Sequence, residues 1–180
     1  SINDTEPKIR EFWSLKEVAI KGLDNLHSGS DTEIINGLED VLKRSVEQQM
    51  VADVPLGAFL SGGIDSSLIV ALMQQQSTQP VKTFTIGFSD ESYNEAKHAK
   101  EVAKYLNTDH ADLYVSHQDA INVIPKLPKI YDEPFSDSSQ IPTFLVSKLA
   151  REHVTVSLSG DAGDELFGGY NRYLLTDQLW

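Results

Sequence analysis

The chain contains 180 residues, 40% apolar and 23% charged, and its 15 basic against 27 acidic side chains give a formal net charge of -12 at pH 7. This length and composition predict one ordinary globular domain with a substantial core. The acidic excess repels phosphate backbones and argues against a general nucleic-acid surface. No apolar run approaches the roughly 20 residues that a membrane span needs.

The sequence contains no cysteine. This excludes disulfides, thiolate zinc sites, iron–sulfur clusters and a Cys nucleophile within the chain, and it favours a cytoplasmic location. The polar, acidic first residues fit neither a secretory signal nor a transit peptide. Because the chain opens on Ser1 rather than Met and keeps a helical pattern up to Trp180, we expect it to be a piece of a longer protein.

Residues 1–30 have weak periodicity and are expected to form a connecting segment, followed by one domain over residues 31–180 that is truncated at its end. Apolar residues recur at helical spacing from Asp31 onwards, and Ser30 with Glu33 offers a capping box. The apolar run Leu56–Leu60 and the segment 81–88 are typical of buried strands, with a helical pattern from Ile64 between them. Strand, helix and strand predict a βαβ unit.

The same alternation continues along the chain. We expect three more helices and two more strands: helices over about 93–106, 117–131 and 141–152, and strands near 111–115 and 153–160. Ser92 and Glu95 form a capping box for the first of these helices, and Pro125, Pro128 and Pro142 limit the other two. This pattern predicts an α/β fold, a parallel sheet with helices on both faces, and ligands beyond the carboxyl ends of the strands at a switch in strand order.

The strongest motif is SGGIDSS, which occupies residues 61–67 where a buried strand turns into a helix. Paired glycines let the backbone approach a ligand closely, and helix-start amides and serine hydroxyls donate to an anion such as pyrophosphate. Asp65 would repel a phosphate unless a divalent cation lies between them, so it is the first candidate magnesium ligand. The segment matches neither a Walker A loop nor GxGxxG. A turn with a capped helix would use the same residue types.

A second motif, SLSGDAGDELFGGYNRY, begins at Ser157 and also follows an expected strand. Its small residues permit a tight turn, and Asp161, Asp164 and Glu165 concentrate carboxylates at the sheet edge that carries the first motif. Two acid-bearing loops at one edge can share one metal ion. An acidic helix N-terminus, favoured by the helix dipole, would use the same residues.

Together these motifs resemble those of a known family. SGGIDSS is similar to the pyrophosphate loop of the PP-loop ATP pyrophosphatases, and its combination with DVPLGAFLSGG and LSGDAGDELFGGY resembles the synthetase domain of the glutamine-dependent asparagine synthetases, over roughly residues 31–173. The resemblance implies a PP-loop fold and an ATP-dependent carbon–nitrogen ligase of asparagine biosynthesis. In that family the side-chain carboxylate of aspartate attacks the α-phosphorus of ATP, pyrophosphate leaves, and ammonia then displaces AMP from the acyl-adenylate.

The resemblance also implies roles for single residues, with ATP and Mg²⁺ as cofactors. It implies that pyrophosphate and magnesium are held by Ser61, Gly62, Gly63, Asp65 and Ser66. Leu60 and Ile86 match positions whose backbone flanks the adenosine, and Ser159 and Gly160 match further nucleotide contacts. Asp161, where many members have Glu, matches a position near the acyl-adenylate. Asp164 matches a metal-linked aspartate, so Asp161 and Asp164 are the expected catalytic residues and Asp65 and Asp164 the expected metal ligands.

The substrates implied by the resemblance are aspartate and ammonia derived from glutamine. The ammonia comes from an N-terminal glutaminase domain with a terminal Cys, which this cysteine-free chain does not contain. A charge-stabilising Lys of the family would lie beyond Trp180, so we expect residues 1–180 alone to bind ATP more readily than they turn it over. Family members commonly form homodimers, and neither nucleic acid nor a membrane is an expected partner.

Other interpretations stay open. The acceptor could be a sugar or peptide carboxylate, or an intramolecular amine as in β-lactam synthetases, and the chain could be a nucleotide-binding module that has lost catalysis. Residues 131–143, with Asp132, Glu133 and Asp137, either help to line a substrate cavity or form a solvated loop with Asp caps. The five histidines have no HExxH or other metal-ligand spacing and are interpreted as surface or structural residues.

Overall fold

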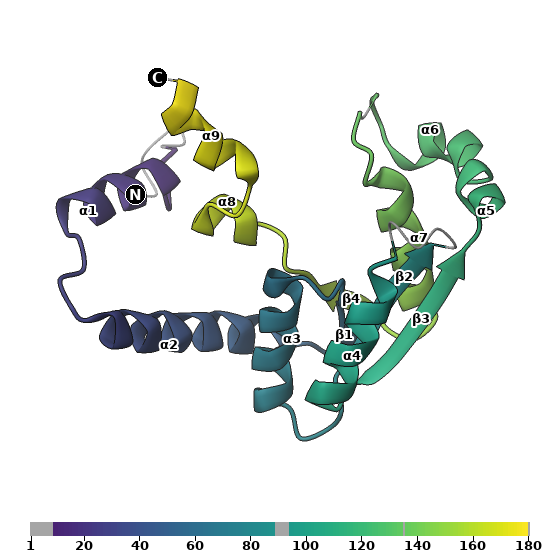
Figure 1. The fold of residues 1–180 in the computed structure, drawn as a ribbon, viewed down its shortest axis with the longest axis horizontal. Helices are drawn as coiled ribbons and strands as arrows, with labels where there is room; N and C mark the ends of the chain where they lie inside the picture. Colours follow the sequence, from purple (N-terminus) through teal and green to yellow (C-terminus); the bar gives the residue numbers. More distant parts are fainter. Residues whose placement is uncertain (1–8, 89–93, 135, 180) are drawn as a thin grey trace, which may run out of the picture. The chain divides into compact units, whose positions relative to one another are not determined.

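The computed structural model describes residues 9–88, 94–134 and 136–179 (Figure 1). The chain divides into two units, residues 1–41 and residues 42–180. The first unit contains α1 (Leu15–Asp24), in which no residue is buried, and the start of α2 (Asp31–Gln49). The expected capping box of α2 is confirmed: the Ser30 amide donates to Glu33 Oε2 at 2.7 Å, and the Glu33 amide donates to Ser30 Oγ at 3.4 Å.

The second unit contains a sheet and the helices that cover it. Its strands are β1 (Leu56–Phe59), β2 (Lys82–Phe88), β3 (Asp109–Val115) and β4 (Val156–Leu158). Besides the end of α2, the described helices are α3 (Ile64–Gln76), α4 (Ala96–Leu106), α5 (His117–Ile121), the 3-10 turn η2 (Ile124–Lys126), α6 (Leu127–Ile130), α7 (Gln140–Arg151), α8 (Gly163–Phe167) and α9 (Asn171–Leu179).

The sheet is parallel throughout, and its strands lie in the order β3-β2-β1-β4. In the register of the central strand, Ala58 lies between Thr83 of β2 and Leu158 of β4. The chain moves outward from β1 through β2 to β3, and then returns to the other side of β1. The loops that follow β1 and β4 therefore start from neighbouring strands where the strand order switches, which is where open α/β sheets bind ligands.

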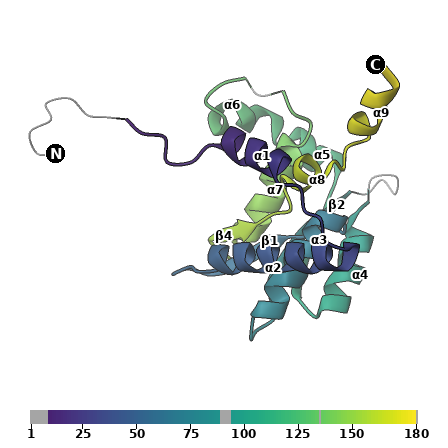
Figure 2. The same cartoon turned by 90° about the vertical axis from the view of Figure 1, so that its left-hand side faces the viewer.

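Helices cover both faces of this sheet, as expected (Figures 1 and 2). Successive residues of a strand point to opposite faces, and in β1 Ala58 packs with α3 and α4 whereas Phe59 packs with α7. The first face buries Val70 and Met73 of α3 together with alanines of α4, and the second packs α7 against Phe84. The expected α/β class and parallel sheet are confirmed.

Two helical expectations need comment. The pattern over 117–131 forms no single helix but three short pieces, α5, η2 and α6. Pro125 and Pro128 explain the breaks, since each stands in the first turn of its own piece, where the missing N–H costs nothing. The helix expected from about residue 93 begins at Ala96 in the described part of the chain, and Ser92 of its expected capping box lies outside the described residues.

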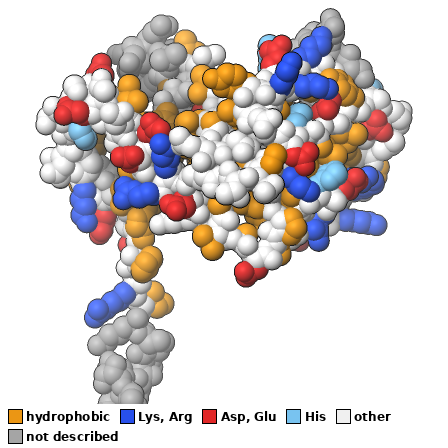
Figure 3. Space-filling view, turned by 90° about the horizontal axis from the view of Figure 1, so that it is seen from below, with side chains coloured by type: hydrophobic (Ala, Val, Ile, Leu, Met, Phe, Trp, Pro, Cys, Tyr) orange, Lys and Arg blue, Asp and Glu red, His pale blue; other side chains and the backbone are white. Residues whose placement is uncertain are grey.

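The surface of the described residues carries mixed charge. On the face seen from below the first view, acidic and basic side chains are interspersed among hydrophobic ones (Figure 3). No helix within the described residues is long and apolar enough to cross a membrane.

One titratable side chain of the sheet, the half-buried His110, belongs to a hydrogen-bonded chain. His110 Nδ1 lies 2.9 Å from Thr83 Oγ1, which lies 3.0 Å from Thr108 Oγ1, and Thr108 Oγ1 donates to the carbonyl of Ala103 at 3.4 Å. Each hydroxyl has one proton to donate, and that of Thr108 goes to the Ala103 carbonyl. Thr108 therefore accepts from Thr83, and Thr83 in turn accepts from His110 Nδ1–H. His110 Nε2 is then a buried acceptor without a hydrogen-bond partner in the described structure.

We expect this histidine to make the protein acid-sensitive. Burial lowers the pKa of His110 below its ordinary value of 6.5. The charge of Lys100 lowers this pKa further and that of Asp112 raises it, and Lys100 Nζ lies 3.8 Å from Asp112 Oδ1. Because the pKa is lower in the folded state, the unfolded chain binds more protons than the folded chain once the pH falls through 6.5. The free energy of unfolding therefore decreases from about pH 6.5 down to the lower pKa that His110 has in the folded protein. Urea unfolding between pH 8 and pH 5 measures this loss.

The matched variant is His110→Asn, which cannot titrate. It should be less stable than the wild type at pH 8, because it disturbs the hydrogen-bonded chain, but its stability should fall less steeply between pH 7 and pH 5. Equal slopes for the two proteins would contradict the assignment.

Candidate functional site

The loop after β1 is shaped by Gly62. Its φ of +85° is a conformation that favours glycine, and a Cβ there would lie 2.7 Å from the backbone nitrogen of Ala99 in α4. Beside it, Ser61 Oγ accepts a hydrogen bond from the Gly63 amide at 3.2 Å and lies 2.9 Å from Ser66 Oγ. Gly62 thus lets the loop pack closely on α4, and the serines tie the loop to the helix that follows.

That helix, α3, begins directly after Gly63, its N-cap residue. The amides of Ile64, Asp65 and Ser66 lie in the first turn, where no earlier carbonyl of the helix can accept from them. They stand at the positive end of a dipole built from 13 residues, a favourable place for an anion. Asp65 is half-buried in the same turn, so a carboxylate lies beside this anion-binding position.

The loop after β4 holds a second carboxylate in place. Ser159 Oγ donates to Asp161 Oδ2 at 2.9 Å, and the Asp161 amide donates to Ser159 Oγ at 3.4 Å. Ala162 then takes a φ of +74°, which is strained for a residue with a Cβ, and α8 starts at the next residue. Asp161 thus lies just before this sharp turn, and Asp164 lies just after it in the first turn of α8.

Two glycines bring the two loops into direct contact. A Cβ on Gly160 would lie 2.6 Å from the Ser66 amide nitrogen and 2.9 Å from the carbonyl carbon of Asp65. A Cβ on Gly163 would overlap the carboxylate of Asp65. Only residues without side chains fit at these two positions, so the start of α8 lies against the first turn of α3.

The contact between the loops forms an acidic cavity of about 860 Å³. Of the residues singled out in the sequence, it brings together Ser61, Gly63, Asp65, Ser66, Gly160, Asp161 and Asp164. Asp161 is exposed, whereas Asp65 and Asp164 are half-buried. Gly62 and Ser159 do not line the cavity. Gly62 packs on α4, and Ser159 holds the Asp161 side chain.

A smaller apolar cavity of about 360 Å³ adjoins the acidic one. Leu60 and Ile86, the two residues matched to the adenosine, both line it. The other lining residues come mainly from β1, β2 and α7: Phe59, Ser61, Phe84, Thr85, Phe88, Glu95, Pro142, Thr143 and Val146. The candidate site therefore consists of an apolar compartment and an acidic one.

Glu165 and Tyr170 form a fixed pair at the rim of the acidic cavity. Tyr170 donates its hydroxyl to Glu165 Oε1 at 2.8 Å, which lowers the pKa of the Glu165 carboxyl and raises that of the phenol. The guanidinium of Arg172 lies 4.2 Å from the centre of the Tyr170 ring, a cation–π geometry. Glu165 is therefore held as a carboxylate facing the cavity.

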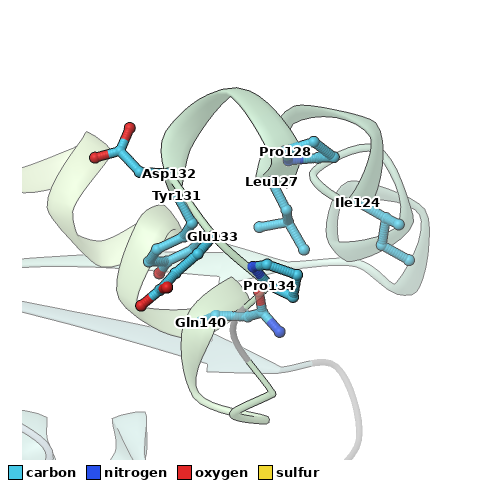
Figure 4. A pocket seen from close by; sticks show the side chains of 8 residues that line it. All are labelled: Ile124, Leu127, Pro128, Tyr131, Asp132, Glu133, Pro134 and Gln140. Carbon is cyan, nitrogen blue, oxygen red and sulfur yellow. The ribbon is translucent and has the colours of Figure 1, made fainter.

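The stretch 131–143 divides between two places. Asp132 and Glu133 belong to a separate cavity of about 550 Å³, beside apolar residues such as Leu127 and Pro134, and the carboxylate of Asp132 points away from them (Figure 4). Asp137 lines the acidic cavity, where its carboxylate accepts from the Ser139 amide at 2.7 Å and its pKa is lowered by Ser139.

The donors of the acidic cavity suit a metal ion of one particular kind. In the described part of the chain, no group of three or more His, Asp or Glu side chains is arranged to hold a metal ion alone. Mg²⁺ is usually held by one or two carboxylates together with phosphate oxygens and water. Asp65 and Asp164 fit an ion of that kind, arriving with a phosphate ligand.

Three residues of the cavity were not singled out in the sequence: Tyr170, and Ser139 and Thr143, which lie in the stretch 131–143 that was offered only as a whole as a possible cavity lining. Ser139 and Thr143 belong to the start of α7, which packs on the opposite face of the sheet from α3, and no motif in the sequence links it to SGGIDSS. Tyr170 lies within the second motif, but its spacing from Glu165 gave no sign of the hydrogen bond.

Comparison with known proteins gives consistent matches. The family model described as "Asparagine synthase" matches residues 37–180. The chain is 41% identical over 143 residues to "Asparagine synthetase [glutamine-hydrolyzing] 1" of Bacillus subtilis, which covers 79% of this chain and 22% of that protein. It is 35% identical over 147 residues to "Asparagine synthetase [glutamine-hydrolyzing] 3" of Arabidopsis thaliana, covering 74% of this chain and 25% of that protein. The chain thus spans about a quarter of the length of these relatives.

Among solved structures, one match is an NH3-dependent NAD synthetase from Campylobacter jejuni, at 16% identity and a TM-score of 0.49, covering 79% of this chain and 62% of that one. Another is an NMN synthetase from Francisella tularensis, at 15% identity and the same TM-score, covering 81% and 61% of the two chains.

Proposed function

Since the chain belongs to the asparagine synthase family, we propose that it is the ATP-binding synthetase part of a glutamine-dependent asparagine synthetase, a PP-loop ligase that adenylates the side-chain carboxylate of aspartate. The observation that carries the proposal is the contact between the loops after β1 and β4. It places Asp65 against Gly163 and brings Asp65 and Asp164 to one cavity beside the start of α3.

In this proposal each of the two cavities binds a different part of the ATP molecule. The adenosine occupies the apolar cavity, beside the backbone of Leu60 and Ile86. The pyrophosphate portion lies at the start of α3, where the first amides of the helix donate to its oxygens and Ser61 and Ser66 line the cavity. Gly63 lines this cavity without a side chain, and Gly160 lets the loop after β4 contact the first turn of α3.

Asp65 and Asp164 would hold Mg²⁺ together with the phosphate oxygens of the nucleotide. The ion supplies positive charge that offsets the repulsion between the carboxylates and the phosphates and stabilises the negative charge on the leaving pyrophosphate. The carboxylate of Asp164 lies against Gly169, where a Cβ would overlap it.

The reaction needs the chain to orient two groups. A carboxylate oxygen of aspartate forms a bond to the α-phosphorus while the bond to the bridging oxygen breaks and pyrophosphate leaves. Ammonia then attacks the acyl carbon, loses a proton and expels AMP, which keeps the carboxylate oxygen. Asp161, held by Ser159, lies at the exposed side of the acidic cavity, and there it positions the acyl-adenylate or accepts the proton of the incoming ammonia.

Further parts of the proposal follow from the family. The nitrogen comes from glutamine through a glutaminase domain, in keeping with relatives that are named as glutamine-hydrolysing. We also propose that the protein forms a homodimer and is located in the cytoplasm.

The test is pyrophosphate release by the protein, expressed from its complete gene, with Mg·ATP and ammonium, in the presence and absence of aspartate. We expect release that depends on aspartate and yields asparagine and AMP in equal amounts. ATP binding without aspartate-dependent release would contradict aspartate as the acceptor, and the same assay with other carboxylates would then identify the acceptor.

A further inference from the structure

Thr143 of α7 stands where the two compartments meet. Among the described residues, only Ser61 and Thr143 line both the apolar cavity and the acidic cavity. Ser61 lies at this junction on the side of β1, and Thr143 lies on the side of α7. A ligand that extends from one compartment into the other passes between these two side chains.

The position of Thr143 is fixed by the packing of its helix. Its amide donates to the Ser139 carbonyl at 2.9 Å, in the first turn of α7. Further along the helix, Leu145 is buried with Val115 and Val123, and Ala150 is buried with Phe84 of β2. Thr143 therefore sits on a helix anchored to the sheet, rather than on a loop that a ligand would have to order.

The two hydroxyls at the junction differ in what they already bind. Ser61 Oγ accepts from the Gly63 amide and is hydrogen-bonded to Ser66 Oγ, so it is engaged within its own loop. The Thr143 hydroxyl is exposed and makes no hydrogen bond within the described part of the chain. Its O–H group is free to donate to a ligand.

We infer that the hydroxyl of Thr143 binds the α-phosphoryl group of the nucleotide. The inference rests on the proposed function, which places the base in the apolar cavity and the pyrophosphate at the start of α3. The phosphoryl group joined to the ribose is the part of the molecule between them. A hydroxyl donor there serves ATP, the acyl-adenylate and AMP alike, because all three carry this group.

The experiment uses fragments of the nucleotide as separate probes. Calorimetric titration with AMP, with adenosine and with Mg·pyrophosphate compares the wild type with Thr143→Val, which keeps the β-branched shape and removes the hydroxyl. We expect AMP to bind the variant about tenfold more weakly, the size of one hydrogen bond to a charged group. Adenosine and pyrophosphate should bind both proteins equally, since neither contains the α-phosphoryl group joined to ribose.

Two further variants separate binding from folding. Thr143→Ser keeps the hydroxyl and should bind AMP within about threefold of the wild type. Thr32→Val makes the same change in the first turn of α2, at a residue that lines neither cavity, and should leave all three affinities unchanged. Circular dichroism verifies that each variant is folded.

The outcomes distinguish the inference from the function on which it rests. A wild type that binds neither AMP nor Mg·pyrophosphate overturns the proposed function and the inference together. A wild type that binds both, with Thr143→Val binding AMP equally well, overturns the inference alone. An equal loss for pyrophosphate and AMP also overturns it, because the hydroxyl would then act on the cavity as a whole.

Discussion

Replacing Asp65 with alanine is expected to weaken Mg²⁺-dependent ATP binding by at least about tenfold to a hundredfold, the loss found when even the groups that orient metal ligands are removed. The protein should stay folded, because Asp65 contributes to α3 mainly through the helix dipole, worth about 0.3–1 kcal/mol. Titration with ATP in the presence and absence of Mg²⁺ measures the effect.

The ATP affinity of Asp65→Ala in the absence of Mg²⁺ makes this test specific for a metal ligand. Asp65 lies in the first turn of α3, beside the amides proposed to receive phosphate. A carboxylate there repels the phosphates once no cation separates them. Asp65→Ala should therefore bind ATP as well as the wild type, or better, when Mg²⁺ is removed with a chelator, although it binds more weakly when Mg²⁺ is present.

A matched control is Asp53→Ala, which removes the same charge from an exposed position in the loop before β1. It should leave ATP binding unchanged under both conditions. The metal assignment is wrong if Asp65→Ala is folded and binds Mg·ATP with the affinity of the wild type.

Gly160→Ala is the second change expected to have a large effect. The added Cβ would lie 2.6 Å from the Ser66 nitrogen and 2.9 Å from the Asp65 carbonyl carbon, both backbone atoms of a helix start. These atoms cannot move without shifting α3 or the loop after β4. We expect a loss of about 1–3 kcal/mol in the free energy of unfolding, as for other overpacked sites.

ATP binding by this variant should weaken both with and without Mg²⁺, because the two loops move apart, whereas Asp65→Ala weakens only the binding that depends on Mg²⁺. Gly37→Ala in α2 is the control. A Cβ there meets nothing within 4 Å, and alanine in a helix is favoured over glycine by up to about 1 kcal/mol. Wild-type stability and ATP affinity in Gly160→Ala would contradict the close contact between the loops.

The sequence predicted the elements that surround the site because each depends on local patterns. SGGIDSS shows a strand-to-helix turn through its own glycines and serines, and the alternation of strands and helices indicates a parallel sheet. The contact of Gly160 and Gly163 with the first turn of α3 is a different matter. It depends on β4 pairing with β1 over a separation of about a hundred residues, which only the packed sheet determines.

Thr143 illustrates what local patterns leave out. It belongs to an ordinary amphipathic helix on the opposite face of the sheet from α3, and nothing in QIPTFLVSKLAR points to a nucleotide. Its place at the junction follows from how α7 packs against β2. The three pieces over 117–131 show the reverse case, because Pro125 and Pro128 mark the breaks in the sequence itself.

The central claim is that a carboxylate attacks the α-phosphorus of ATP between the two loops. The most direct test is a reaction of the protein, expressed from its complete gene, with Mg·ATP, ammonium and aspartate labelled with ¹⁸O in its side-chain carboxylate. Mass spectrometry then follows the label. We expect one ¹⁸O atom in each AMP released and none in pyrophosphate. Label in inorganic phosphate, or asparagine formed while AMP stays unlabelled, would contradict the account.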